Sequence, residues 1–310
     1  MRRLALLSLA VVLLAGCGGD RGGSADTGTT DSGLAGRIQV DGSSTVAPYA
    51  TAAAEGFRSG NPGVDITVGV SGTGGGFERF CSGETDISDA SRAIEDDEAA
   101  ACKEKGIDHV EVQVANDALT VVVNPENDWA DCLTVAQLKT IWDSGSKVKS
   151  WKDVDPSFPD VELKLYGPGT DSGTFDYFTK EINGEEGRSR SDYAASEDDN
   201  VIVQGVSGDK GALGYFGLSY YEQNKDKLRA VSIDGGNGCV EPSIDTAQSG
   251  KYAPLSRPLF MYANAEALTR PEVEAFLQYV LDNEREIAQQ AQFVPLTDEQ
   301  LQQAKDALGS

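Results

Sequence analysis

The sequence predicts an α/β protein with mostly parallel sheets and about two domains. Short apolar or alternating segments, which are typical of strands, recur along the chain, and most precede stretches whose apolar residues fall at helical spacing. No internal repeat of fixed period is present. Removing residues 1–16, which have the features of a leader, from the 310-residue chain leaves 294 residues, a length that suits two domains with sizeable cores.

The chain begins with the features of an export signal. Two arginines precede an apolar run over residues 4–14 that is too short to span a membrane. The run ends in Leu-Ala-Gly-Cys, which resembles a bacterial lipobox, so we expect residues 1–16 to be a signal peptide and Cys17 to be lipidated. The alternative is an ordinary signal peptide followed by an incidental cysteine. Residues 17–36 are rich in Gly, Ser, Thr and Asp and are predicted to form a lipid-anchored flexible linker.

The first half of the chain alternates between the two kinds of element. In chain order we expect a strand at 37–40, a helix from about Val46 to residue 60, a strand at 65–70, a short helix that includes Phe77, Phe80 and Cys81, strands at 109–114 and 118–124, a helix at 133–142 capped by Thr134, and a strand at 161–166.

The second half continues the alternation. We expect a helix with apolar residues at 175, 178 and 182, a buried strand and short helix within 211–221, a strand at 257–264, a helix over 271–291 with Pro271 in its first turn, and a last helix capped by Thr297 and Gln300 and ended by Gly309.

Charge and cysteine content exclude several classes of protein. The 50 acidic residues outnumber the 26 basic ones and are spread along the chain, which favours solubility and argues against binding nucleic acid or anionic membranes. With one histidine and no C-x-x-C spacing, we expect no zinc site and no metal or other cofactor.

Four cysteines follow the leader, and an even number in an exported chain predicts disulfide bonds. Three pairings are possible. We favour Cys81–Cys102, which closes a local loop, with Cys132–Cys239 as the second bond.

Three predicted helices begin in the same kind of turn, where a strand leads through small and hydroxyl residues into the helix. The turns are DGSSTVAP at 41–48, VSGTGGGF at 70–77 and GPGTDSGT at 167–174. Each offers unpaired backbone N–H groups, the positive end of a helix dipole and side-chain hydroxyls, and each hydroxyl has the alternative role of capping its own helix. If the three starts converge, they hold an oxyanion with neutral donors. The hydroxyls are those of Ser44, Thr45, Ser71, Thr73, Ser172 and Thr174.

Charged candidates lie in two further stretches. Asp89 and Arg92 stand three residues apart, and the arginine offers a rigid fork of donors to an oxyanion, whereas an aspartate accepts protons and does not suit a bare anion. The alternative is a surface ion pair of small energy. Arg188 and Arg190 are further candidates, with solvated loop charges as the alternative.

Taken together, five stretches resemble the phosphate-binding proteins of bacterial phosphate ABC transporters, the PstS family, and most of all its SphX-like branch. The likeness runs from about residue 37 to the C-terminus. The stretches are DGSSTV, SGTGGG, DISDASR, GPGTDSGTFDYF and GALGYFGLSYY.

This resemblance implies a two-domain periplasmic-binding-protein fold of type II that closes on phosphate in the interdomain cleft. Residues 37–115 and 257–310 would form domain I, and 116–256 domain II. The implied function is high-affinity binding of inorganic phosphate outside the cytoplasmic membrane and its delivery to the permease subunits of an ABC transporter, by a lipid-anchored monomer that is not an enzyme.

The resemblance also implies the phosphate-binding residues. One departure matters: many relatives place an arginine four residues before Ser172, where this chain has Pro168. The cation must then come from elsewhere, and we expect Arg92, with Arg190 as a second candidate. By motif, Thr45 and the Val46 N–H match the first turn, Thr73 and Gly74 with Ser71 nearby match the second, Asp89 matches a carboxylate that accepts a phosphate proton, and Ser172, Gly173 and Thr174 match the third.

Other functions stay open at this point. A receptor for another tetrahedral oxyanion, such as sulfate or molybdate, would share the fold, but Asp89 argues against it because sulfate carries no proton near neutral pH. A secreted phosphatase is disfavoured because the chain has neither a G-x-S-x-G elbow nor a Walker loop with lysine. A surface adhesin or signalling lipoprotein built on the same domain is not excluded.

Overall fold

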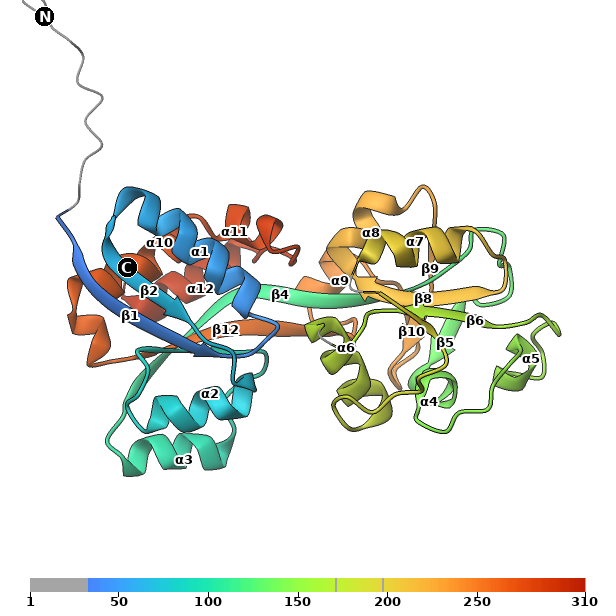
Figure 1. The fold of residues 1–310 in the computed structure, drawn as a ribbon, viewed down its shortest axis with the longest axis horizontal. Helices are drawn as coiled ribbons and strands as arrows, with labels where there is room; N and C mark the ends of the chain where they lie inside the picture. The colour runs from blue at the N-terminus through green and yellow to red at the C-terminus, as the bar shows by residue number, and fades with distance from the viewer. Residues whose placement is uncertain (1–32, 171, 197, 310) are drawn as a thin grey trace, which may run out of the picture.

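The computed structural model describes residues 33–170, 172–196 and 198–309. Figure 1 shows two lobes joined by two long strands, β4 (His109–Val123) and β12 (Ser256–Asn264). The predicted signal peptide, Cys17 and most of the predicted linker lie outside the described residues. None of the described helices is long and apolar enough to cross a membrane.

The first lobe contains both ends of the described chain. Helices α1, α10, α11 and α12 cover one face of its sheet, and α2 and α3 cover the other (Figure 1). Its elements are β1 (Ala35–Gly42), α1 (Ala47–Gly60), β2 (Gly63–Val68), α2 (Gly72–Cys81), β3 (Ile87–Ala90), α3 (Asp96–Glu104), the 3-10 turn η2 (Ala267–Thr269), α10 (Pro271–Asp282), α11 (Glu284–Gln290) and α12 (Asp298–Leu308).

The second lobe has a core on each face of its sheet, one against α7 and the other against α4, α5 and α6. Its elements are β5 (Cys132–Thr134), α4 (Val135–Trp142), α5 (Trp151–Val154), β6 (Lys164–Gly167), α6 (Gly173–Phe178), the π-helical turn η1 (Thr179–Asn183), β7 (Ala194–Ala195), α7 (Asp199–Ser207), β8 (Ala212–Gly217), α8 (Leu218–Asn224), β9 (Arg229–Ala230), β10 (Ser232–Asp234), β11 (Cys239–Val240) and α9 (Ile244–Gln248).

The α/β class is confirmed, but the sheets are mixed rather than mostly parallel. Strands β1, β2 and β3 pair in parallel, as do β6, β7 and β8, whereas β12 is antiparallel to both β3 and β4, and β4 is antiparallel to β8. The reason is that β12 returns along β4 to close the first lobe, so the two strands that join the lobes run in opposite directions.

Two predicted boundaries are also different. The strands expected at 109–114 and 118–124 form one strand, because Asn116 and Asp117 continue the pairing with β12 instead of turning. Strand β1 begins at Ala35, two residues inside the predicted linker, because Ala35 and Gly36 already pair with β2.

Helix ends follow the predicted signals. Thr134 and Thr297 each form a capping box with a glutamine three residues later.

The helix expected over 271–291 is instead two helices, α10 and α11. The Asn283 side chain donates a 2.9 Å hydrogen bond to the Tyr279 carbonyl and ends the first helix there.

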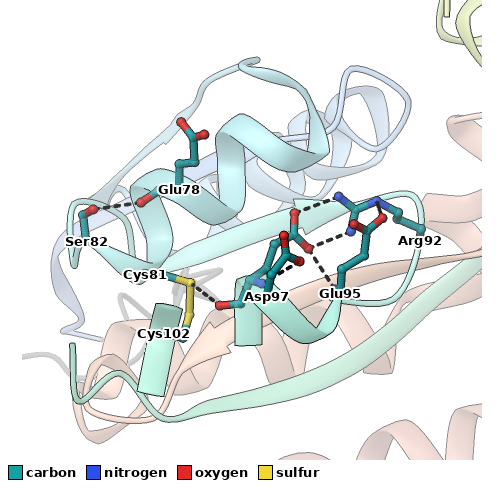
Figure 2. The surroundings of a disulfide bond; sticks show 8 residues. Glu78, Cys81, Ser82, Arg92, Glu95, Asp97 and Cys102 are labelled. Atoms are coloured by element: carbon teal, nitrogen blue, oxygen red, sulfur yellow. Dashed lines mark hydrogen bonds and ion pairs between the residues drawn. A yellow bond between two sulfur atoms is a disulfide. The ribbon is translucent and has the colours of Figure 1, made fainter. Parts of the chain in front are cut away.

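Both predicted disulfides are confirmed. Cys81–Cys102 joins α2 to α3 (Figure 2), with its Cα atoms 4.2 Å apart. Cys132–Cys239 joins β5 to β11 across 107 residues of chain, with its Cα atoms 6.0 Å apart.

The first lobe buries an unusual carboxyl group, that of Glu284 at the start of α11. The side chain is 2 % exposed, and its Oε1 accepts a 2.7 Å hydrogen bond from the Leu296 N–H. Burial raises the pKa of Glu284 to about 7 from an ordinary value of 4.5. The folded protein therefore holds a proton there that the unfolded chain releases between these two pH values.

We expect Glu284 to weaken the fold as the pH rises. Because the pKa is higher in the folded state, its contribution to the free energy of unfolding falls between about pH 4.5 and 7 and is constant above. Relative to Glu284→Gln, which keeps the acceptor but cannot ionise, the fall is on the order of 3 kcal/mol. Urea unfolding of both proteins across this range measures it, and parallel pH profiles would contradict the assignment.

Candidate functional site

A cavity of about 650 Å³ lies between the two lobes. The first lobe contributes the starts of α1 and α2 and the segment after β3, and the second contributes α6 and η1. The start of β12, one of the two strands that join the lobes, also lines the cavity. The residues used below are Ser44, Thr45, Ser71, Thr73, Gly74, Arg92, Tyr177, Lys180 and Arg257, which all line the cavity.

Helix α1 begins without a side-chain cap. Val46 occupies the N-cap position with no capping hydrogen bond, and among the described residues the backbone N–H groups of Ser44, Thr45 and Val46 have no partner. Pro48 stands in the first turn, where its missing N–H costs nothing. The alternative role, in which these hydroxyls cap α1, is therefore not what the structure shows, and the free N–H groups favour an anion.

The turn before α1 depends on Gly42. Its φ of +144° suits glycine, and a Cβ there would lie 2.1 Å from the Asp89 carbonyl oxygen. That oxygen accepts a 2.9 Å hydrogen bond from the Ser43 N–H, so β3 fixes where the turn starts. The sequence therefore brings the start of α1 directly beside the carboxyl end of β3.

Helix α2 also begins without a side-chain cap. Its hydroxyls already have partners: Ser71 donates a 2.8 Å hydrogen bond to Asp41, and the Thr73 hydroxyl lies 3.2 Å from that of Ser91. Both residues still line the cavity, as does Gly74. These hydroxyls are thus held in fixed orientations at the cavity wall.

The third start, that of α6, differs from the other two. The Ser172 hydroxyl accepts a 3.2 Å hydrogen bond from the Thr174 N–H and so caps its own helix. Ser172, Gly173 and Thr174 lie beside the cavity rather than among its lining residues. Gly173 approaches the first lobe so closely that a Cβ there would lie 2.9 Å from the Thr45 hydroxyl oxygen. The starts of α1 and α6 are therefore in contact across the junction.

Asp89 is fully buried in β3, behind Ser43, and is not part of the cavity wall. Neither carboxyl oxygen has a hydrogen-bond partner within the described protein. Burial, and next the charge of Asp41, raise the pKa of Asp89 well above its ordinary value. A buried carboxyl without a partner is costly, so this position calls for a group that shares a proton with it.

The two arginines proposed as cations both have other partners. Arg92 lines the cavity, but Glu98 takes two of its N–H groups at 2.7 Å and Glu95 lies 3.2 Å away (Figure 2). Arg190 is held in the second lobe by Asp192 and by the carbonyls of Ile141 and Val148, away from the cavity. Its buried guanidinium links the end of α4 to the segment at Val148 through hydrogen bonds to their carbonyl groups.

Arg257 is the cavity cation that sequence analysis missed. It stands at the start of β12, opposite Asp117 of β4, and its Nη2 donates a 2.9 Å hydrogen bond to the Thr45 hydroxyl. A signal was available, because Arg257 is the sole charged residue between Lys251 and Glu266, and Asp117 stands alone in the apolar stretch before residue 126. Two lone opposite charges in buried strands indicate a pair.

The cavity wall combines acidic and basic side chains. Glu95, Asp176, Glu181 and Glu186 line it together with Arg92, Lys180 and Arg257. The one histidine, His109, packs against the rings of Phe80 and Tyr262 in the first lobe. Among the described residues, the cavity wall places no hydroxyl beside a histidine, and the arrangement suits holding an oxyanion by uncharged donors.

Comparison with known proteins places the chain among a defined group. The PBP superfamily domain matches residues 25–284. Protein SphX of Synechococcus elongatus is 48% identical over 262 residues, which cover 84% of this chain and 77% of that protein. Phosphate-binding protein PstS of Staphylococcus saprophyticus is 44% identical over 289 residues, which cover 93% and 87%.

A solved structure is similar to this chain in both sequence and fold. The chain described as "a possible phosphate binding protein" from Planctomyces limnophilus is 48% identical and superposes with a TM-score of 0.87, over 89% of this chain and 98% of that one.

We expect Arg190 to stabilise the fold, and Arg188 two residues away to contribute little. Arg190→Ala removes a guanidinium that is 6 % exposed by residue and leaves two buried carbonyls unpaired, so it should lower the free energy of unfolding by roughly 2–4 kcal/mol. Arg188→Ala removes only exposed ion pairs and should cost less than about 1 kcal/mol. Urea unfolding measures both, and a loss below about 1 kcal/mol in Arg190→Ala would show that Arg190 has no structural role.

Proposed function

Because this chain belongs to the PBP superfamily and, within it, to the group of SphX and PstS phosphate-binding proteins, we propose that it binds inorganic phosphate between its two lobes and delivers it to the permease of an ABC transporter. The observation that carries the proposal is the uncapped start of α1, where Ser44 and Thr45 line the cavity and their N–H groups have no partner among the described residues; Val46 is buried next to them.

In this proposal neutral donors from three turns hold the phosphate oxygens. The first turn supplies Ser44, Thr45 and the Val46 N–H, and the second supplies Ser71, Thr73 and Gly74. The third turn supplies Ser172, Gly173 and Thr174, and a small movement of α6 brings them to the ligand. Uncharged dipoles contribute strongly to this because they are fixed before the anion arrives and are partly shielded from water.

Asp89 shares a proton with the phosphate in this proposal. Phosphate near neutral pH carries at least one proton, and a hydrogen bond forms whether that proton stays on the phosphate or on the carboxyl. Sulfate brings no proton, so an ionised Asp89 repels it. The unpartnered, fully buried carboxyl supports this role, which also requires the turn at Ser43 to move, because Asp89 does not line the cavity.

The protein is a receptor and not an enzyme. The phosphate-binding proteins that it resembles are receptors too. We further propose that it works as a monomer on the outer face of the bacterial cell membrane, where the predicted leader and Cys17 would anchor it. The cavity itself also suits another tetrahedral oxyanion, so the titration below includes sulfate.

We expect the purified chain, freed of bound ligand, to bind one inorganic phosphate and to hydrolyse no phosphoester. Calorimetric titration with phosphate, arsenate and sulfate measures the first, and release of p-nitrophenol from p-nitrophenyl phosphate measures the second. Phosphate and arsenate should bind far more tightly than sulfate, because both carry a proton. Tight sulfate binding with no heat from phosphate would replace the proposal with a sulfate receptor.

We expect Asp89→Asn to remove most of the preference for phosphate. The amide keeps the shape, loses the charge and adds a donor, so sulfate affinity should rise far more than phosphate affinity changes. Sites that recognise a ligand's own proton discriminate by about 10⁴-fold or more.

The pH dependence gives a second measurement on the same variant. Sulfate needs the protonated carboxyl, so its affinity for the original protein should increase as the pH is lowered toward the raised pKa of Asp89. In Asp89→Asn this slope should disappear. An unchanged ratio of phosphate to sulfate affinity, with the slope retained, would assign the selectivity to another group.

A further inference from the structure

We propose that Arg257 is the cation that neutralises the bound oxyanion, and that it acts from the strand that joins the two lobes. This inference rests on the proposed function, since it names the charged group of the same site. The argument for Arg257 uses its own contacts and does not require that any one of the three helix starts binds the anion by itself.

Arg257 is held in one orientation by two neighbours, Asp117 and Tyr177. Its Nε lies 3.2 Å from the Asp117 carboxylate, directly across the β4–β12 pairing, and its guanidinium carbon lies 3.6 Å from the centre of the Tyr177 ring. Tyr177 is fixed in turn by a 2.7 Å hydrogen bond from its hydroxyl to the Pro254 carbonyl. An arginine stacked and paired in this way has lost its side-chain freedom before a ligand binds.

The guanidinium still has donors to offer. Nη2 contacts the Thr45 hydroxyl at 2.9 Å, and among the described residues Nη1 has no hydrogen-bond partner. The side chain is 15% exposed, and Arg257 lines the same cavity as Ser44 and Thr45 at the start of α1. An oxyanion within hydrogen-bond distance of Thr45 is therefore within reach of Arg257 as well.

The other cavity cations are less suited to this role. Arg92 is balanced by two carboxylates, one of which takes two of its N–H groups. Lys180 is exposed, so water screens its charge, and no hydrogen bond links it to a cavity hydroxyl within the described chain. Asp117 balances Arg257, but by one monodentate contact, which leaves the rest of the fork for a ligand.

The test compares phosphate affinity among four variants by calorimetry, with thermal unfolding as a control for folding. Arg257→Gln combined with Asp117→Asn removes both charges, so that no buried aspartate is left without its partner. Arg257→Lys keeps the charge and loses the fork. Lys180→Gln and Arg92→Gln are the matched controls, because each removes another cation from the cavity wall.

We expect the double variant to lose about 100-fold or more in phosphate affinity and Arg257→Lys to lose about tenfold, because hydrogen bonds to charged groups contribute about 1.5–3 kcal/mol each. Lys180→Gln and Arg92→Gln should change the affinity by less than about threefold. The rise in unfolding temperature that phosphate causes in the original protein should vanish in the double variant.

Two outcomes would overturn the inference while the proposed function stands: phosphate affinity within about threefold of the original in the double variant, or a larger loss in Lys180→Gln or Arg92→Gln. If the double variant does not fold, an unchanged affinity in Arg257→Lys overturns it and a loss of about tenfold or more supports it. Failure of the original protein to bind phosphate would instead overturn the proposed function, and this inference with it.

Discussion

The antiparallel pairing of β4 with β12 is the constraint on which the rest of the structure depends. These two strands contribute to both lobes, so their register fixes how the lobes face each other (Figure 1). The same register places Asp117 opposite Arg257 at the junction, where the start of α1 and the ring of Tyr177 both reach the arginine. A one-residue slip of either strand would turn its charged residue to the opposite face of the sheet and separate the pair.

A chain with a net charge of −24 can still present a site for an anion, because the field at a site depends on the nearest groups. Most acidic residues of the chain lie where water and salt screen them over about 10 Å. At the cavity, the backbone N–H groups at the start of α1 and one oriented arginine are fixed donors that most of these charges cannot offset through water. The overall charge then governs solubility, while the fixed local donors govern binding.

The sequence predicted the site's neutral parts better than its charged parts. Hydroxyl and glycine turns are local signals, and the predicted positions at Thr45, Ser71 and Thr73 line the cavity. Charge partners are not local: Arg92 looked available because Glu98 belongs to the next helix, and Arg190 looked exposed because the carbonyls that bury it come from residues 141 and 148.

The same limit applies to the fold. Capping boxes and the local Cys81–Cys102 bond follow from short-range spacing, and they were predicted; Cys132–Cys239 followed as the pair that remained. The single strand through Asn116 and Asp117 was not, because those polar residues look like a turn until β12, 140 residues later, pairs with them. Arg257 was missed for the same reason, since its partner on β4 and its contact with Thr45 are both distant in the chain.

Gly173 lies against Thr45, and the two lobes can approach this closely only because Gly173 has no Cβ atom. A methyl group at position 173 would meet the backbone of Thr45 at 3.1 Å, closer than such contacts normally allow, so the two lobes would stop short of their present spacing. The aperture of the binding site is therefore encoded by side-chain size at a single position that makes no polar contact through a side chain. A single substitution at position 173 could therefore change the spacing of the lobes without removing any donor to the ligand.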